Sequence, residues 1–381
     1  MKKILVIFLL CLLWLPTSTV FAADAEAAPD QEFFTAKVIK ILAEQEITRQ
    51  DGSIAVQQNI RLLGLEGEWT GREVEYIGIS GLDVISNNVY REGDKVIVLS
   101  SPDTDGNEIY YITDYVRQGY LIWLLVILFL VIFAVAFGKG IKALISLFLT
   151  FVVIIWFIIP RILAGGNPVL YTVIGSLIIL AIIIYLTEGW NQKSHLAVTS
   201  IVISLFITGT LAVLFTSLAR LTGSAEEEVM YLIGVGKGII DFKGLLLAGI
   251  IIGTLGALDD GVISQVSAVE ELKKANPNLT KMQIYTSAMK VGVSHIGSMT
   301  NTLFLAYAGA SMPLLLIFSV RQEPFLRFSQ IVNNEMIATE IVRAFVGSIG
   351  LALVVPIATA LAAFYLKIEV KGPITESAKK Q

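Results

Sequence analysis

The sequence is poor in charge, in cysteine and in histidine. Only 16% of its 381 residues are charged, 55% are hydrophobic, and the mean hydropathy is +0.74. A soluble protein of this length could not bury so much apolar surface, which excludes a water-soluble domain as the whole molecule. The composition instead predicts an integral membrane protein, with the lipid bilayer as its first partner.

The scarcity of nucleophilic and metal-binding side chains excludes further classes of protein. The single cysteine, Cys11, lies in an N-terminal apolar run, and His195 and His295 are the only histidines. This set leaves no disulfide and too few imidazoles for a histidine-rich metal site. The sequence also lacks the signatures of serine hydrolases, zinc proteases, P-loop NTPases and dinucleotide-binding folds. We therefore expect no enzyme, no cofactor and no metal.

The N-terminus has the three parts of a secretory signal. Lys2 and Lys3 precede the apolar run ILVIFLLCLLWL, and the small residues that end at Ala22 offer a cleavage site. Residues 1–22 are therefore predicted to be a signal peptide. An uncleaved membrane anchor is the alternative.

Residues 24–118 form the one predicted water-soluble part of the chain. Alternating apolar and polar residues, as in DKVIVLSS and EIYYITDY, are separated by turn signals such as Asp51 followed by Gly52. Five or six short strands of this kind favour a small closed barrel, similar to an OB fold, because closure removes exposed edges. The segment holds 18 acidic and 8 basic residues, so we expect it to repel nucleic acid.

Apolar runs of membrane-spanning length follow one another after this segment. Residues 119–367 are predicted to form a mostly α-helical, polytopic membrane domain, and residues 368–381 a cytoplasmic tail. About seven spans are expected, at residues 120–137, 141–159, 168–187, 196–218, 242–260, 299–320 and 341–366. The predicted inner loops and tail hold eleven lysines, against seven lysines and arginines in the outer loops. This bias, like the export signal, predicts an extracytoplasmic N-terminal domain and a cytoplasmic C-terminus.

Two successive predicted helices each carry a stripe of small and polar residues. At about 100° per residue, seven residues of the stretch 249–272 share one face, and four residues of the next helix do so as well. The second helix should begin at a capping box formed by Thr280 and Gln283. The stripes comprise Gly249, Gly253, Gly256, Asp260, Ser264, Ser267 and Glu271, and Lys290, Ser294, Gly297 and Asn301.

We expect the two stripes to face each other, because glycines at this spacing let helix backbones approach closely. The antiparallel arrangement would then place Asp260 near Asn301, and Glu271 near Lys290. Such a shielded edge is predicted to serve as a polar pathway or as a helix-packing seam.

Two further segments leave alternatives open. Glu340 and Arg343, at the outer edge of the last predicted span, are three residues apart and are predicted to pair; a structural ion pair and a gate are both consistent with this spacing. Residues 225–241 follow a second capping box and are expected to form an amphipathic outer helix, or else to re-enter the membrane.

Three stretches resemble one family. The sequences LGALDDGVISQVSAVEEL, TNTLFLAYAGASMPLLL and NNEMIATEIVRAFVGSIGLALVVPIATALAA are similar to the YibE/F-like family of bacterial multi-pass membrane proteins. The resemblance is expected to cover most of the mature chain, including the exported domain. It implies a bacterial cell membrane location, and it assigns no catalytic or binding residue because the family has no established activity.

The function expected from these features is that of a transporter or channel for an unidentified ion or small solute. The alternative is a membrane scaffold, sensor or assembly factor that presents its exported β domain. Either protein would act alone, as a homo-oligomer or with a partner membrane protein.

Overall fold

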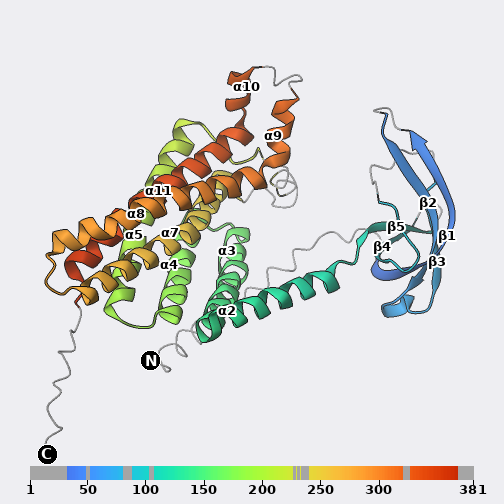
Figure 1. Cartoon of the computed structure of the whole chain (residues 1–381). Helices are drawn as coiled ribbons and strands as arrows, with labels where there is room; N and C mark the ends of the chain where they lie inside the picture. The colour runs from blue at the N-terminus through green and yellow to red at the C-terminus, as the bar shows by residue number, and fades with distance from the viewer. Residues whose placement is uncertain are drawn as a thin grey trace, which may run out of the picture. The chain divides into compact units, whose positions relative to one another are not determined.

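A computed structural model describes residues 32–48, 52–79, 88–102, 107–225, 240–320 and 327–367, together with Val229 and Leu232 (Figure 1). The predicted signal peptide, the predicted tail at 368–381 and most of the segment 225–241 lie outside the described residues. The chain divides into two compact units, of which one contains Phe21–Val135 and the other Ala136–Gln381.

The first unit contains a five-stranded antiparallel sheet with the strand order β3-β2-β1-β4-β5. Its central strand β1 pairs with both β2 and β4, and two register shifts in the β1–β2 ladder mark bulges that bend a strand. The edge strands β3 and β5 approach each other, but no ladder joins them among the described residues. The predicted closed barrel is therefore confirmed only as a half-barrel sheet. The strands are β1 (Glu32–Thr48), β2 (Ile54–Gly64), β3 (Glu73–Ile77), β4 (Lys95–Pro102) and β5 (Glu108–Tyr115).

Alternating side chains of these strands form one core cluster together with Trp69, which lies in a short turn of helix between β2 and β3. Phe34 stacks on Trp69 with 4.5 Å between the ring centroids, and Tyr110 meets both rings edge-on. The Tyr110 hydroxyl donates a hydrogen bond of 2.6 Å to Glu108. Burial and this hydrogen bond raise the pKa of Tyr110 to about 12, so the phenol is a neutral donor at physiological pH.

The remaining described chain is helical. Phe137, with φ of 44°, interrupts α2 between the first two predicted spans, so that the stretch consists of two helices joined by a bend. Asp241 caps α7, and the Thr280–Gln283 capping box begins α8, which confirms the predicted capping box. The helices are α2 (Gln118–Val153), a π-helix (Ile154–Ile158), α3 (Ile159–Leu163), α4 (Pro168–Thr187), α5 (Gln192–Leu218), α7 (Phe242–Ala275), α8 (Lys281–Ala310), α9 (Met312–Ser319), α10 (Phe328–Val332) and α11 (Glu335–Tyr365).

Five helices in the described part of the chain are long and apolar enough to cross a membrane, so the predicted count of seven is not confirmed. The first two predicted spans count as one because the helical stretch Gln118–Leu163 runs through both. The sixth, residues 299–320, is divided between α8 and α9 at Ser311. Pro313 lies in the first turn of α9, and because it has no N–H to donate to the carbonyl of Gly309, the hydrogen-bond ladder of α8 ends before it.

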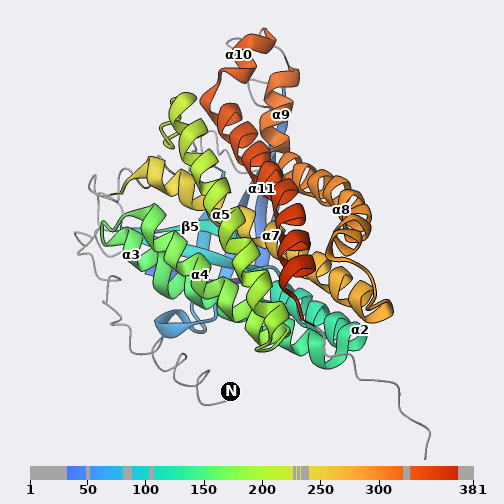
Figure 2. The same cartoon turned by 90° about the vertical axis from the view of Figure 1, so that its left-hand side faces the viewer.

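Three helices, α5, α7 and α11, form the centre of the helical unit and lie side by side (Figure 2). Small residues allow this close packing: a Cβ built on Gly350 would lie 2.2 Å from the Thr208 hydroxyl oxygen, and one on Gly347 would lie 3.5 Å from that of Thr254. Helix α4 packs on α7, and α8 packs on α7 and α11. The site described below therefore rests on a closely packed core.

Candidate functional site

The predicted stripe of α7 does not form the inward face of this helix. Instead, Val262, Val266 and Val269 are 0% exposed and join a core cluster with residues of α4 and α11. Branched apolar side chains gain more contact on burial than glycine or serine, which is why this face packs inward. Of the predicted stripe, Ser264 and Ser267 are half-buried, whereas Gly249, Gly253, Gly256, Asp260 and Glu271 are exposed.

Helix α8 likewise packs through a different face. Gly292 is buried, and a Cβ built on it would lie 3.1 Å from Oε1 of Gln265 on α7. The predicted α8 residues, Lys290, Ser294, Gly297 and Asn301, are all exposed.

The prediction that the two stripes face each other is therefore wrong within one chain. Glu271 pairs with Lys274 at 2.9 Å, in place of the predicted Lys290. Asp260 and Asn301 both lie on exposed faces. A role of the exposed stripes in a pathway or in contacts between chains stays a prediction.

The predicted pair of Glu340 and Arg343 is confirmed. Nη1 of Arg343 lies 2.6 Å from Oε1 of Glu340, and the two side chains are 23% and 21% exposed. The residues stand five and eight positions after the start of α11, about 8 and 12 Å along the helix axis. The pair thus lies within one of the five candidate membrane spans.

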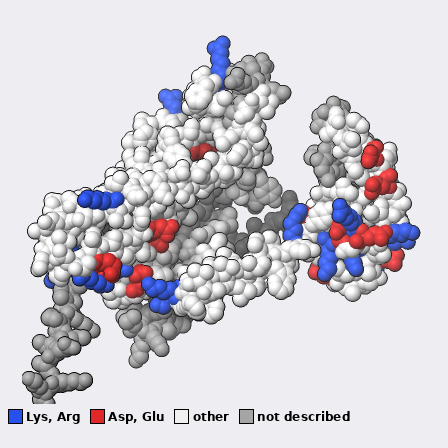
Figure 3. Space-filling model, viewed as in Figure 1, with Lys and Arg blue, Asp and Glu red and all other residues white. Residues whose placement is uncertain are grey.

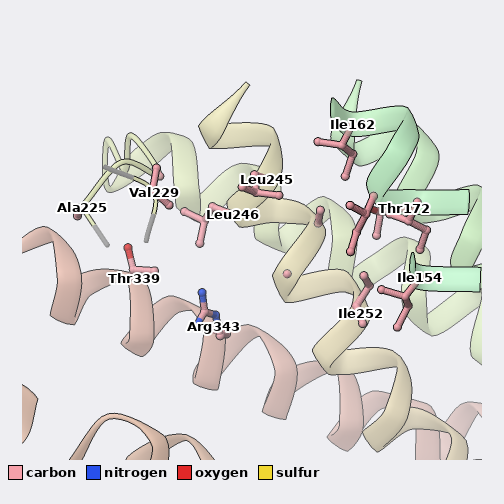
Figure 4. A pocket seen from close by; sticks show the side chains of 15 residues that line it. Ile154, Ile162, Thr172, Ala225, Val229, Leu245, Leu246, Ile252, Thr339 and Arg343 are labelled. Atoms are coloured by element: carbon pink, nitrogen blue, oxygen red, sulfur yellow. The ribbon is translucent and has the colours of Figure 1, made fainter. Parts of the chain in front are cut away.

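The two members of this pair line different cavities. Arg343 borders a cavity of about 290 Å³, in which Thr339 and Thr172 are the other side chains with hydroxyl groups. Figure 4 shows Thr339 and Arg343 rising from α11 toward Leu245 and Leu246 of α7. Glu340 borders a larger cavity of about 880 Å³, formed by α8, α9, α10 and α11. The negative charge of the pair, on Glu340, therefore borders the larger cavity, and the positive charge, on Arg343, borders the smaller one.

Tyr307 of α8 is a member of this site that the sequence analysis missed. It lines the larger cavity with Glu340, and its hydroxyl oxygen lies 2.9 Å from a Cβ built on Gly253. Gly253 thus leaves room for the phenol, and it is the residue of the predicted α7 stripe that does meet α8. The signal in the sequence was weak, because Tyr307 is a single polar aromatic residue within the small-residue run AYAGAS.

A second buried polar group joins α7 to α11. Gln265 and Thr359 are 0% exposed, and the Thr359 hydroxyl donates a hydrogen bond of 3.0 Å to Oε1 of Gln265. Among the described residues, Nε2 of Gln265 has no hydrogen-bond partner, and neither has Oδ1 of Asp259. Neither of these side chains lines the two cavities.

Charges near the C-terminal ends of α7 and α11 have a structural role. Lys193 lies 3.1 Å from Glu188 and 3.4 Å from Glu270, so it joins the ends of α4, α5 and α7. Lys273 donates hydrogen bonds of 3.1 and 2.6 Å to the carbonyls of Ala362 and Leu366 at the end of α11, where a cation is favourable. In the part of the chain that the structure describes, no group of three His, Cys, Asp or Glu side chains could hold a metal ion.

Apolar helices of membrane-spanning length, packed around a half-buried ion pair, define a polytopic membrane protein. A sequence model of the YibE/F-like protein family matches residues 124–368, and the chain belongs to this family. The match begins after the sheet, so it does not support the expectation that the resemblance includes the exported domain. Comparison with curated proteins and with solved structures finds no match.

Proposed function

We propose that the protein is a transporter or channel for an ion or small solute, and that its passage runs beside Glu340 and Arg343. The observation that carries this proposal is the ion pair itself, because its two members border separate cavities within a membrane bundle. As part of the same proposal, residues 1–22 direct export, the sheet lies outside the cell membrane as an OB-like domain, and the C-terminus lies in the cytoplasm.

Energetics support a functional reading of the pair. A charged side chain at the centre of a membrane helix costs about 3 kcal/mol on insertion scales, and less toward the helix end where this pair lies. Pairing offsets part of this cost, yet apolar residues of similar size often stabilise a protein as well as a buried ion pair does. Stability alone therefore gives little reason to keep two charges here, whereas ion and substrate pathways commonly contain such residues.

The cavities support the same reading. The larger one, of about 880 Å³, lies within the range of about 300–1,000 Å³ that is typical of small-molecule sites. Opening the pair would let a solute contact Glu340 from one cavity and Arg343 from the other. Separation and re-formation of the pair thus gates passage between the two cavities.

Flux into proteoliposomes tests this function. The purified chain is reconstituted and a panel of ions and small solutes is tested for the native protein, Glu340→Gln and Arg343→Gln. We expect the native chain to move at least one solute and each variant to do so at least tenfold more slowly. Glu68→Gln is the matched control, because Glu68 is an exposed carboxylate outside both stripes and lines neither cavity.

Two outcomes would contradict the proposal. Absence of flux for every solute, with native protein that remains folded, would favour the scaffold, sensor or assembly factor. Equal flux through the native protein and both ion-pair variants would show that the passage does not run beside Glu340 and Arg343.

A further inference from the structure

The described residues that line the larger cavity combine aromatic rings with a single acidic group. Four aromatic residues line it, and the rings of two of them, Phe304 and Phe345, lie 5.5 Å apart between centroids. The other two are Tyr307 of α8 and Phe328 of α10. The cavity is therefore walled largely by π-faces and aliphatic groups, which suit a ligand with an apolar body.

Its charge has one sign. Glu340 lines the larger cavity, whereas its partner Arg343 lines the smaller one. Among the described residues that line the larger cavity there is no lysine, arginine or histidine. Figure 3 shows the same scarcity of charge over most of the visible surface of the helical unit. Glu340 is thus the one charged group among the described lining residues, and its negative charge favours a cation over an anion.

The lining also distinguishes between kinds of cation. Calcium takes about six to eight oxygen ligands, and magnesium requires octahedral coordination. This cavity offers the Glu340 carboxylate and the hydroxyls of Tyr307, Ser311 and Ser319 among mostly apolar groups. An organic cation needs only a counter-ion and aromatic faces, because cation–π attraction replaces part of its hydration.

We propose that this cavity binds an amphiphilic organic cation, such as a quaternary ammonium or phosphonium ion, which replaces Arg343 as the counter-ion of Glu340. The proposal rests on the proposed function, since it names the substrate class of the same site. Cation binding separates the ion pair, and departure of the cation lets the pair re-form.

The test uses radiolabelled tetraphenylphosphonium as the probe and the full chain, purified in lipid nanodiscs. Empty nanodiscs measure partitioning of the probe into lipid, and excess unlabelled probe defines the saturable component. We expect saturable binding to the native protein, at least tenfold weaker binding to Glu340→Gln, and native-like binding to the control Glu68→Gln.

Glu340→Gln removes the ion pair together with the carboxylate, so a second variant separates binding from folding. The double substitution Glu340→Arg with Arg343→Glu keeps an ion pair on α11 but moves the carboxylate to the smaller cavity. We expect this variant to remain monodisperse on gel filtration and to lose saturable probe binding. Native-like binding by the reversed pair, or no saturable binding to the native chain, would overturn the cation site.

The two proposals fail in different ways. If the probe binds saturably and in a Glu340-dependent way but no solute is transported, the proposed cation site is supported and the proposed transport is contradicted. If another solute is transported in a Glu340-dependent way but the probe does not bind, the proposed transport is supported and the proposal that the substrate is an organic cation is contradicted.

Discussion

At the scale of single residues, glycines of similar sequence context have opposite surroundings. Gly350 of α11 and Gly256 of α7 both lie within apolar helices. A Cβ built on Gly350 would lie 2.2 Å from the Thr208 hydroxyl oxygen, whereas one built on Gly256 would meet no atom within 4 Å. Only the first glycine is required for contact between helices of one chain.

Alanine at these two positions should therefore have opposite effects on stability. We expect Gly350→Ala to destabilise the bundle by about 1–3 kcal/mol, because α5 and α11 must separate. Gly256→Ala should be neutral or stabilising by up to about 1 kcal/mol, since alanine favours the helix and nothing obstructs it. Thermal unfolding of the two purified variants beside the native chain measures the difference. A loss of stability in Gly256→Ala equal to that in Gly350→Ala would show that an unseen partner covers the α7 stripe.

These glycines also show why the site was only partly predictable from the sequence. The spacing of Gly249, Gly253 and Gly256 correctly puts them on one face, but not on the face that packs inward. In a membrane, lipid and protein interior are both apolar, so the polarity of a face says little about its neighbour. Glu340 and Arg343 were predictable because a local spacing of three residues determines their contact.

At the scale of helices and strands, local signals located the ends of elements well. Thr280 caps α8 as expected, because capping depends on residues within one turn. The break at Ser311 was missed, since the apolar run continues through it. The half-barrel was predicted as a closed barrel, because alternation identifies strands but not whether the two sheet edges pair.

The contact between α7 and α11 through Gln265 and Thr359 supports a double-mutant prediction. Thr359→Val removes the hydroxyl that donates to Oε1 of Gln265 and should cost about 1–2 kcal/mol, because a buried amide is left without this partner. Gln265→Met with Thr359→Val replaces both polar groups and should be nearly neutral. Unfolding of the two single variants and the double variant gives the coupling energy. Strictly additive losses would show that this hydrogen bond does not join the helices.

At the scale of the whole molecule, composition was sufficient for the class of protein, but not for the arrangement around the site. The apolar content predicted a helical membrane domain, and the structure has five candidate spans among its described residues. Tyr307 and Glu340 border one cavity although 33 positions separate them in the sequence, and no local pattern reports such a contact. The helical membrane domain could therefore be predicted from the sequence, but the two cavities within it could not.

The predicted orientation can be tested with single cysteines, because Cys11 is the only natural one and lies in the predicted signal peptide. In a Cys11→Ser background, cysteine is placed at exposed Lys37 of β1 or exposed Asn278 between α7 and α8. A membrane-impermeant maleimide added to spheroplasts should label Lys37→Cys directly, and Asn278→Cys only after the membrane is permeabilised. The expected contrast follows from export of the sheet and from the lysine bias of the inner loops. Labelling of Asn278→Cys in intact spheroplasts, with Lys37→Cys protected, would reverse the orientation and place the Glu340 cavity toward the cytoplasm.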